Sequence, residues 1–417
     1  MRFPKRYLFQ ILFFLCVGIP YIDDYELTFF VWIFTAAVSL SHSYSIGILK
    51  FTSFYIGIFV LAVIATFAHD YKAYYIIRDA TYLLKPIIGI LIGYQICRRI
   101  DFKNTFKTVI YTGVIIALIH YLVIVYAIIE KHAFTVNEIR LNAGMFSDFE
   151  VYVLIMLLFH DKFELDLTKK QIRYFTWIVA ISAFLYMART NFVQFLILFL
   201  AMKGYFKINR TSLVAIAVAV GFVAIGYSAI LYINPKRNGP GIEALLYKIK
   251  VAPVEPFKTK IDVDNWKDLN DNYRSYENIR TVKQVTRSGS KATYFGLGMG
   301  SRIDLKREIW LRENLRYISI LHNGFMTVFL KSGLVGVLLS LASILMLIRQ
   351  RKSSVPILSN INLLMVGTGI FMLFSNWVFM GFYNLIDSKS ILIGLLICFK
   401  EMAVKDQMVS VNEGISS

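Results

Sequence analysis

Long apolar runs separated by short polar connections dominate the sequence. Hydrophobic residues make up 57% of the 417 residues, and only 17% of the residues are charged. A soluble domain has about a quarter charged residues, whereas roughly 20 consecutive apolar residues are typical of a helix that crosses a membrane. The pattern therefore predicts an all-α polytopic membrane protein with about twelve transmembrane helices. The predicted spans lie near residues 7–22, 27–45, 51–68, 82–97, 107–129, 146–160, 173–188, 190–203, 212–233, 319–347, 357–379 and 386–399.

The basic residues of the short connections predict which side of the membrane each connection occupies. If the N-terminus is cytoplasmic, the basic clusters at 98–103, 169–173, 203–210 and 349–352 all fall in the cytoplasm. Lys and Arg accumulate in short cytoplasmic loops of membrane proteins. The acidic connection 23–26 falls on the opposite side. We therefore expect both termini to be cytoplasmic.

This topology divides the chain into four parts. Residues 1–233 contain transmembrane helices 1–9, and 234–318 form one long extracytoplasmic (periplasmic) loop. Residues 319–400 contain transmembrane helices 10–12, and 401–417 form a cytoplasmic tail.

The long loop is unusually basic for an extracytoplasmic segment. It contains 17 Lys or Arg against 10 Asp or Glu, a net charge of +7. Topology does not require this charge, because long loops cross the membrane largely regardless of it. An anionic ligand such as a phosphate or pyrophosphate is one explanation, and a merely solvated basic surface is the other. The net charge of +18 for the whole chain follows from the positive-inside pattern, so we expect no nucleic-acid partner.

Arginines mark two candidate sites on the outer side. Arg140 begins the segment 140–146 just before the sixth predicted span, and Arg189 interrupts the apolar stretch 175–202. An arginine at membrane depth is costly unless it faces a polar cavity or a partner, which makes Arg189 a functional candidate. A tight hairpin between two short spans, with Arg189 reaching outward, is a compatible alternative.

Further candidates lie in and after the long loop. Arg274 precedes an amphipathic stretch, and Gly298 and Gly300 belong to a glycine-rich segment that could let a ligand approach the backbone closely. No strand–helix unit surrounds these glycines, which excludes a nucleotide-binding fingerprint, and a plain turn is the alternative. His322 lies where the loop re-enters the membrane. A neutral histidine can accept a proton, although a lone histidine is often only structural.

The motifs of metal-dependent and nucleotide-dependent enzymes are missing from the sequence. It has no H-E-x-x-H motif, no G-x-S-x-G elbow and no Walker A loop. We therefore expect that the protein binds no metal and no cofactor. Arginine and histidine side chains would carry out any catalysis.

The order of these motifs resembles that of the bacterial O-antigen polymerase and O-antigen ligase superfamily. R-x-x-x-G-x-F at 140–146 is followed by A-R-T at 188–190, F-G-x-G-x-G at 295–300 and H-N-x-F-x-x-x-F-x-x-x-G-x-x-G at 322–336. The resemblance covers roughly residues 135–345. The sequence departs from the pattern at Ala188, where serine is common, and at 147–149, where an asparagine is usual.

The resemblance implies a GT-C-like helical fold in the bacterial inner membrane. It also implies a metal-independent glycosyltransferase that takes an undecaprenyl-pyrophosphate-linked oligosaccharide as donor on the outer face. The acceptor would be another carrier-linked repeat for a polymerase, or lipid A–core for a ligase. A chain-length regulator and the lipid bilayer itself would be further partners in lipopolysaccharide or other surface-polysaccharide biosynthesis.

Roles for individual residues follow from this resemblance. His322 would be the general base. Arg189 and Arg274 would hold the pyrophosphate, because guanidinium groups are permanently charged and bind phosphate oxygens in pairs. The remaining expected contacts to pyrophosphate or glycan are Arg140, Arg280, Asn323, Gly298 and Gly300.

A secondary transporter or lipid flippase is the alternative from another functional class. Such proteins also have about twelve spans and charges within the membrane. Against this alternative, the two halves of the sequence show no clear repeat, and transport by rocking does not require a long outer loop.

Overall fold

The chain is described by a computed structural model. The structure describes residues 5–144, 147–206, 210–237, 239–240, 242–310, 314–350 and 353–416.

Each predicted span overlaps an apolar helix of the described residues. These helices are α1 (Lys5–Gly18), α2 (Tyr25–Val38), α3 (Ile46–Thr66), α4 (Ala73–Arg99), α5 (Phe102–Glu130), α7 (Asp148–Leu158), α8 (Lys169–Leu185), α9 (Arg189–Met202), α10 (Arg210–Ile233), α15 (Gly324–Ile348), α16 (Pro356–Val378) and α17 (Lys389–Ser416).

Seven segments in the described part of the chain are long and apolar enough to cross a membrane. Six coincide with α3, α4, α5, α10, α15 and α16, and the seventh joins α1 to the short helix η1 (Ile19–Ile22). The helices α2 and α9 are apolar but shorter. The protein is therefore a helical, polytopic membrane protein, while the number of twelve spans stays a prediction.

Polar residues define where several helices begin. The side chains of Asp24 and Ser45 accept hydrogen bonds from backbone N–H groups of the first turns of α2 and α3. Thr168 and Gln171 cap α8 reciprocally. Such caps satisfy N–H groups that have no partner within the helix. The helix ends consequently fall at polar residues and not at the limits of the apolar runs.

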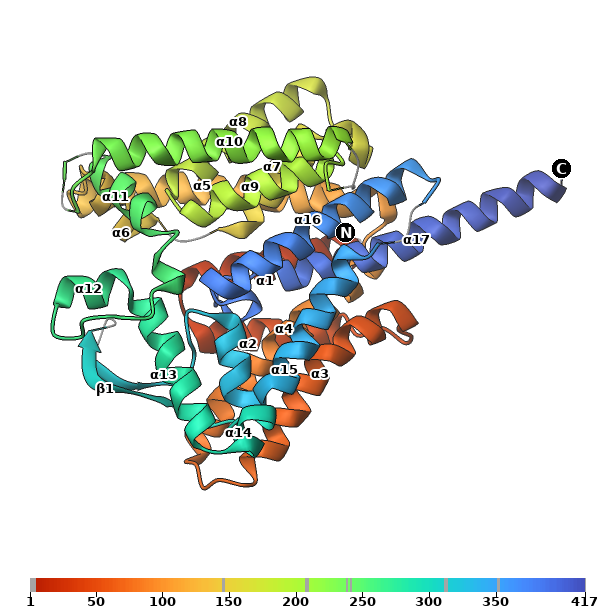
Figure 1. Cartoon of the computed structure of the whole chain (residues 1–417). Coiled ribbons are helices and arrows are strands. Elements are labelled where there is room, and N and C mark those ends of the chain that lie inside the picture. Colours follow the sequence, from red (N-terminus) through yellow and green to blue (C-terminus); the bar gives the residue numbers. More distant parts are fainter. Residues whose placement is uncertain are drawn as a thin grey trace.

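The helices pack around one large apolar core. Buried side chains of α1–α5, α7–α9 and α15–α17 form it, with α4 lying along α17 and α16 contacting both α9 and α15. Many other apolar side chains on these helices are exposed, as lipid-facing residues are. Figure 1 shows α10 on the outside of the bundle, and none of the residues whose burial is described in its most apolar stretch, 216–233, is buried.

The long loop 234–318, predicted to be extracytoplasmic, folds in its described residues into short elements at one end of the bundle (Figure 1). They are α11 (Glu243–Val251), η3 (Glu255–Phe257), α12 (Trp266–Asp271), α13 (Tyr273–Arg287), α14 (Ser290–Phe295), β1 (Ile303–Trp310) and β2 (Asn314–Ile318). The helix α6 (Val136–Ala143) precedes α7, and η2 (His160–Phe163) and η4 (Gly381–Tyr383) lie in other connections.

The hairpin of β1 and β2 is an exception to the all-helical expectation. The strands pair antiparallel, with Ile303 opposite Ile318 and Trp310 opposite Asn314. Ile303 and Leu305 are buried and the residue between them is not, which is the alternation of a half-buried strand. A hydropathy search for membrane spans does not detect such a short, amphipathic pair.

The outer elements share a second, smaller apolar cluster. It includes Leu269, Val285 and Leu305 from the loop together with Phe329 and Leu330 of α15. The loop therefore packs onto the membrane helix that follows it, and this packing fixes the position of the connection that carries His322.

Candidate active site at the loop end of the bundle

A buried carboxylate holds His322 in one orientation. Nδ1 of His322 lies 3.0 Å from Oε1 and 3.2 Å from Oε2 of Glu277 on α13, and its backbone N–H donates to Oε2 at 3.1 Å. The ring of Tyr273 stands edge-on to the imidazole at 5.6 Å between centroids. The backbone carbonyl of His322 accepts a hydrogen bond from the N–H of Met380. These contacts fix both the backbone and the imidazole ring of His322.

This arrangement determines which nitrogen of His322 can react. The carboxylate of Glu277 can only accept, so Nδ1 carries the donated proton and Nε2 of the neutral ring keeps its lone pair. Glu277 is 1% exposed, whereas the side chain of His322 is 41% exposed. The nearby negative charge of Glu277 raises the pKa of His322 above its ordinary value of 6.5.

Sequence reasoning did not single out Glu277. It lies three residues after Arg274 on an amphipathic helix, so both side chains project from the same face of α13. This three-residue spacing was the sequence feature that could have pointed to Glu277. Glu277 is one of ten acidic residues in the loop, so its charge alone gives no reason to place it beside His322.

Asn323 has a structural role and one unused group. Its side-chain oxygen accepts from the N–H of Met326 and caps the first turn of α15. Its amide nitrogen is buried and has no hydrogen-bond partner among the described residues. Since buried donors without partners are rare in proteins, this group next to His322 is available to a ligand oxygen.

Four cations gather beside this histidine. Arg140 of α6, Arg189 of α9 and Arg274 of α13 interact electrostatically with one another, and Lys248 of α11 interacts with Arg140 and Arg189. We call these four residues the cation cluster. The carboxylate of Glu255 lies 3.4 Å from Nη1 of Arg274 and balances only part of the charge. Arg274 and Glu255 also influence the charge of His322, which places the cluster and the histidine in one region.

Like charges held together at partly buried positions favour an anion between them. Burial and the charge of Arg274 lower the pKa of the Arg140 guanidinium, and burial with Arg140, Arg189 and Arg237 lowers the pKa of Lys248. A bound phosphate would relieve both effects. The Nε atom of Arg274 is also buried without a partner within the described part of the chain.

Local backbone geometry puts Arg189 into the cluster. Met187 has a positive φ of 49°, which separates α8 from α9, and Arg189 is the first residue of α9. Its guanidinium donates to the backbone carbonyl of Lys248. The interruption of the apolar stretch is therefore a helix–helix turn whose arginine contacts the outer loop.

Three predicted ligand-binding residues lie elsewhere. Arg280 donates from Nε and Nη2 to the carbonyl of Asp304, at 3.1 and 3.0 Å, and tethers α13 to β1. Gly298 packs against the end of α3, where a Cβ would lie 2.5 Å from the backbone nitrogen of Thr66. Gly300 packs against the ring of Tyr71. Phe146, the end of the R-x-x-x-G-x-F motif, is outside the described residues.

The glycine-rich segment docks onto the membrane helices through a break in α15. Gly333 has φ 65° and ψ −164°, so the helix is interrupted there. The carbonyls of Leu330 and Lys331 instead accept hydrogen bonds from the N–H groups of Leu297 and Gly298, at 2.8 and 3.1 Å. We call residues 296–301 docked in this way the glycine clasp.

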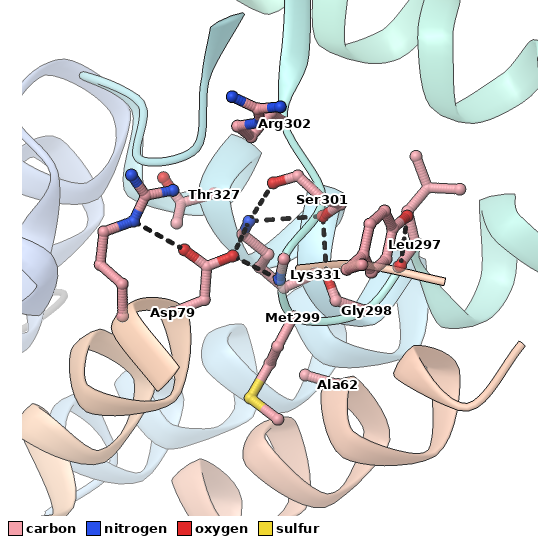
Figure 2. Close-up of polar contacts among 12 residues, drawn as sticks. Ala62, Asp79, Leu297, Gly298, Met299, Ser301, Arg302, Thr327 and Lys331 are labelled. Atoms are coloured by element: carbon pink, nitrogen blue, oxygen red, sulfur yellow. Dashed lines mark hydrogen bonds and ion pairs between the residues drawn. The ribbon is translucent and has the colours of Figure 1, made fainter. Parts of the chain in front are cut away.

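A buried ion pair completes the clasp (Figure 2). Nζ of Lys331 lies 2.6 Å from Oδ2 of Asp79 on α4 and also donates to the carbonyl of Ser301. The N–H of Gly300 donates to the same Oδ2 at 2.7 Å. Lys331 and Asp79 are both fully buried, and removing one member of such a pair costs about 3–5 kcal/mol. The clasp thus fixes the loop against α4 and α15, at Leu330 and Lys331 just before the break at Gly333.

The chain matches no protein-family model, and no curated protein is similar enough to count as a match. The candidate site is therefore interpreted from its own geometry and from the motifs of the sequence.

Proposed function

We propose that the protein is a membrane glycosyltransferase that transfers undecaprenyl-pyrophosphate-linked glycan on the outer face of the bacterial inner membrane. Its product would be polymerised O-antigen or another surface polysaccharide. The proposal includes a GT-C-like arrangement of about twelve spans with both termini in the cytoplasm. Transfer of the glycan to lipid A–core, as by an O-antigen ligase, is the alternative within the same chemistry.

One observation supports this proposal most strongly. A histidine oriented by a buried carboxylate lies in the same region as four cations that carry more positive charge than their neighbours balance. Transfer from a lipid-linked diphosphate sugar needs both features: a base for the acceptor hydroxyl and positive charge for the departing diphosphate.

The proposed reaction is one displacement at the anomeric carbon. Nε2 of His322 accepts the proton of an acceptor hydroxyl as that oxygen bonds to the anomeric carbon of the donor. The bond between this carbon and the diphosphate oxygen breaks, and the diphosphate leaves with its electron pair. Arg140, Arg189, Lys248 and Arg274 stabilise the negative charge that develops on it. Glu277 stabilises the imidazolium that His322 becomes.

A deletion strain tests this proposal and separates its two forms. Surface glycan is resolved on a gel after deletion and complementation. Loss of a polymerase leaves a single repeat on the lipid A–core, whereas loss of a ligase leaves glycan on its carrier. The His322→Ala variant should fail to complement although it is inserted at the wild-type level. Wild-type chain lengths from this variant would refute the role of His322 as base.

Buried charges also leave open a transporter or flippase as a distant alternative. In the bundle, Lys389 forms ion pairs with Asp148 at 2.5 Å and Asp387 at 2.7 Å, and all three side chains are fully buried. Transporters use such groups in ion pathways. These charges are paired with one another, which favours a structural role. A flippase would show a different defect in the deletion strain, with carrier-linked single repeats retained on the cytoplasmic side.

A further inference from the structure

A cavity opens at the opposite end of the bundle from the candidate active site. Its volume is about 870 Å³, within the range of ligand-binding cavities. It lies among the ends of α3, α4 and α15 and the middle of α17, and the positive-inside pattern predicts that this end faces the cytoplasm. Its lining has an apolar part and a charged part.

The apolar part of the lining lies deeper in the bundle. Phe51 and Met365 lie five and nine residues after the starts of α3 and α16, and Ile397 lies three residues before Lys400 on α17. Met346 and Leu347 of the last turn of α15 add to the apolar lining. Apolar cavities of about 150 Å³ already bind small apolar molecules, so a cavity of this size suits a hydrocarbon chain.

The charged part lies beside the ends of α4 and α15 and includes Lys400 and Glu401 of α17. Arg98 donates from Nη1 to the carbonyl of Ser43, and Lys400 donates to the side-chain oxygen of Gln350 at 2.9 Å. The carboxylate of Glu401 accepts from the hydroxyls of Ser45 and Tyr94. Two cations against one carboxylate give this part of the lining a net positive charge.

We infer that this cavity binds an anionic phospholipid of the inner leaflet, with its acyl chain along the apolar wall and its phosphate toward Arg98 and Lys400. Basic pockets between membrane helices on the cytoplasmic side are typical sites for anionic lipid headgroups. Phe51 and Met365 lie deeper in the bundle than Arg98 at the end of α4, which matches the order of chain and headgroup in a leaflet. This site is separate from the proposed transfer reaction and does not depend on it.

Lipid retention by the purified full-length protein tests this inference. The protein is washed extensively in mild detergent, and bound phospholipid is extracted and identified by mass spectrometry. We expect about one anionic phospholipid to remain per wild-type chain. Met346→Trp, which fills the cavity, and Arg98→Gln, which removes a headgroup contact, should each lower retention at least severalfold.

Two matched substitutions serve as controls. Leu345→Trp adds the same side chain at the neighbouring residue of α15, which is 61% exposed and does not line the cavity. Arg349→Gln removes a charge from the same end of the bundle outside the lining. Both variants should retain lipid as the wild type does. Equal retention by all five proteins, or retention of zwitterionic lipid alone, would overturn the inference.

A thermal-shift experiment distinguishes a lipid from a soluble phosphate. Phosphatidylglycerol added to delipidated protein should raise the melting temperature, and Met346→Trp should abolish the rise. Glycerol phosphate, which has the charge without the chain, should raise it far less. An equal rise with glycerol phosphate would mean that the apolar wall is not used, and the site would then be one for soluble anions.

Discussion

At the scale of single residues, the contact between Glu277 and His322 determines how the site could respond to pH. The carboxylate is buried and accepts from both Nδ1 and the backbone N–H of His322. Its charge favours the protonated imidazole, which cannot act as a base. The neutral, reactive form therefore accumulates only as the pH rises through the elevated pKa of His322.

Replacing Glu277 by glutamine should move the acidic limb of the pH–rate profile. The amide oxygen of Glu277→Gln can still accept from Nδ1, but the charge that raises the pKa of His322 is gone. We expect the midpoint of the limb to lie above pH 6.5 in the wild type and to shift to lower pH in the variant. Initial rates of glycan transfer in detergent, measured across pH, check this. An unshifted midpoint would show that Glu277 does not act through the charge of His322.

Replacing Arg274 by lysine tests whether its guanidinium group binds a diphosphate through paired hydrogen bonds. Arg274→Lys keeps the charge but loses the planar fork, so the transfer rate should fall on the order of 10²-fold. Arg280→Lys is the matched control, because Arg280 lies on the same helix and contacts only the carbonyl of Asp304 in the contacts described above. It should retain most activity. Comparable losses in both variants would indicate a general effect on α13.

The sequence predicted part of this residue arrangement. Arg140, Arg189, Arg274 and His322 stood out through their positions in motifs, and the structure places them in one region. Their chemical roles stay predictions. Lys248 could not be identified in the same way, because α11 brings it to the cluster through packing between segments that are distant in sequence.

At the scale of secondary-structure elements, the break in α15 is the feature that couples the loop to the membrane helices. A continuous helix would use the carbonyls of Leu330 and Lys331 internally. Gly333 frees them to accept from the glycine clasp. A Cβ at Gly333 would lie 2.3 Å from the backbone carbon of Tyr294, so only glycine permits this close approach.

Replacing Gly298 of the glycine clasp by alanine should lower the stability of the protein more than its left-handed backbone conformation alone explains. Gly298 and Gly204 share a φ of +80°, but only Gly298 has protein atoms where a Cβ would be. Gly204→Ala should lower stability by about 1–2 kcal/mol, the usual cost of a left-handed alanine. Gly298→Ala should lower the melting temperature further and reduce activity, because the clasp holds the loop that carries His322. Equal melting temperatures for the two variants would contradict the docking of the clasp.

Hydropathy could locate the membrane helices but not their ends or interruptions. The apolar run 319–347 predicted one span, whereas α15 begins at Gly324 after the cap of Asn323 and is broken at Gly333. Lys331 and Ser332 precede Gly333 in this run, but two polar residues and a glycine do not by themselves show that a helix is broken. The interruption depends on a neighbouring segment that supplies the hydrogen bonds, and such a partner is not visible in local sequence.

At the scale of the whole molecule, charge is distributed unequally between the two ends of the bundle. The basic connections gather at one end, while the outer elements with the cation cluster lie at the other. The topology prediction assigns the first group to the cytoplasm. The candidate active site can meet a donor on the outer face only if this assignment holds, so the orientation of the chain constrains its proposed chemistry.

Cysteine labelling in intact cells tests this orientation directly. The three native cysteines are buried, so new cysteines can be distinguished from them. Ser290→Cys places an exposed thiol on the outer loop, and His42→Cys places one in the connection between α2 and α3. A membrane-impermeant maleimide should label Ser290→Cys in intact spheroplasts and His42→Cys only after permeabilisation, because the former is predicted outside and the latter inside. The reverse pattern would put the cation cluster in the cytoplasm, where a donor exposed on the outer face could not reach it.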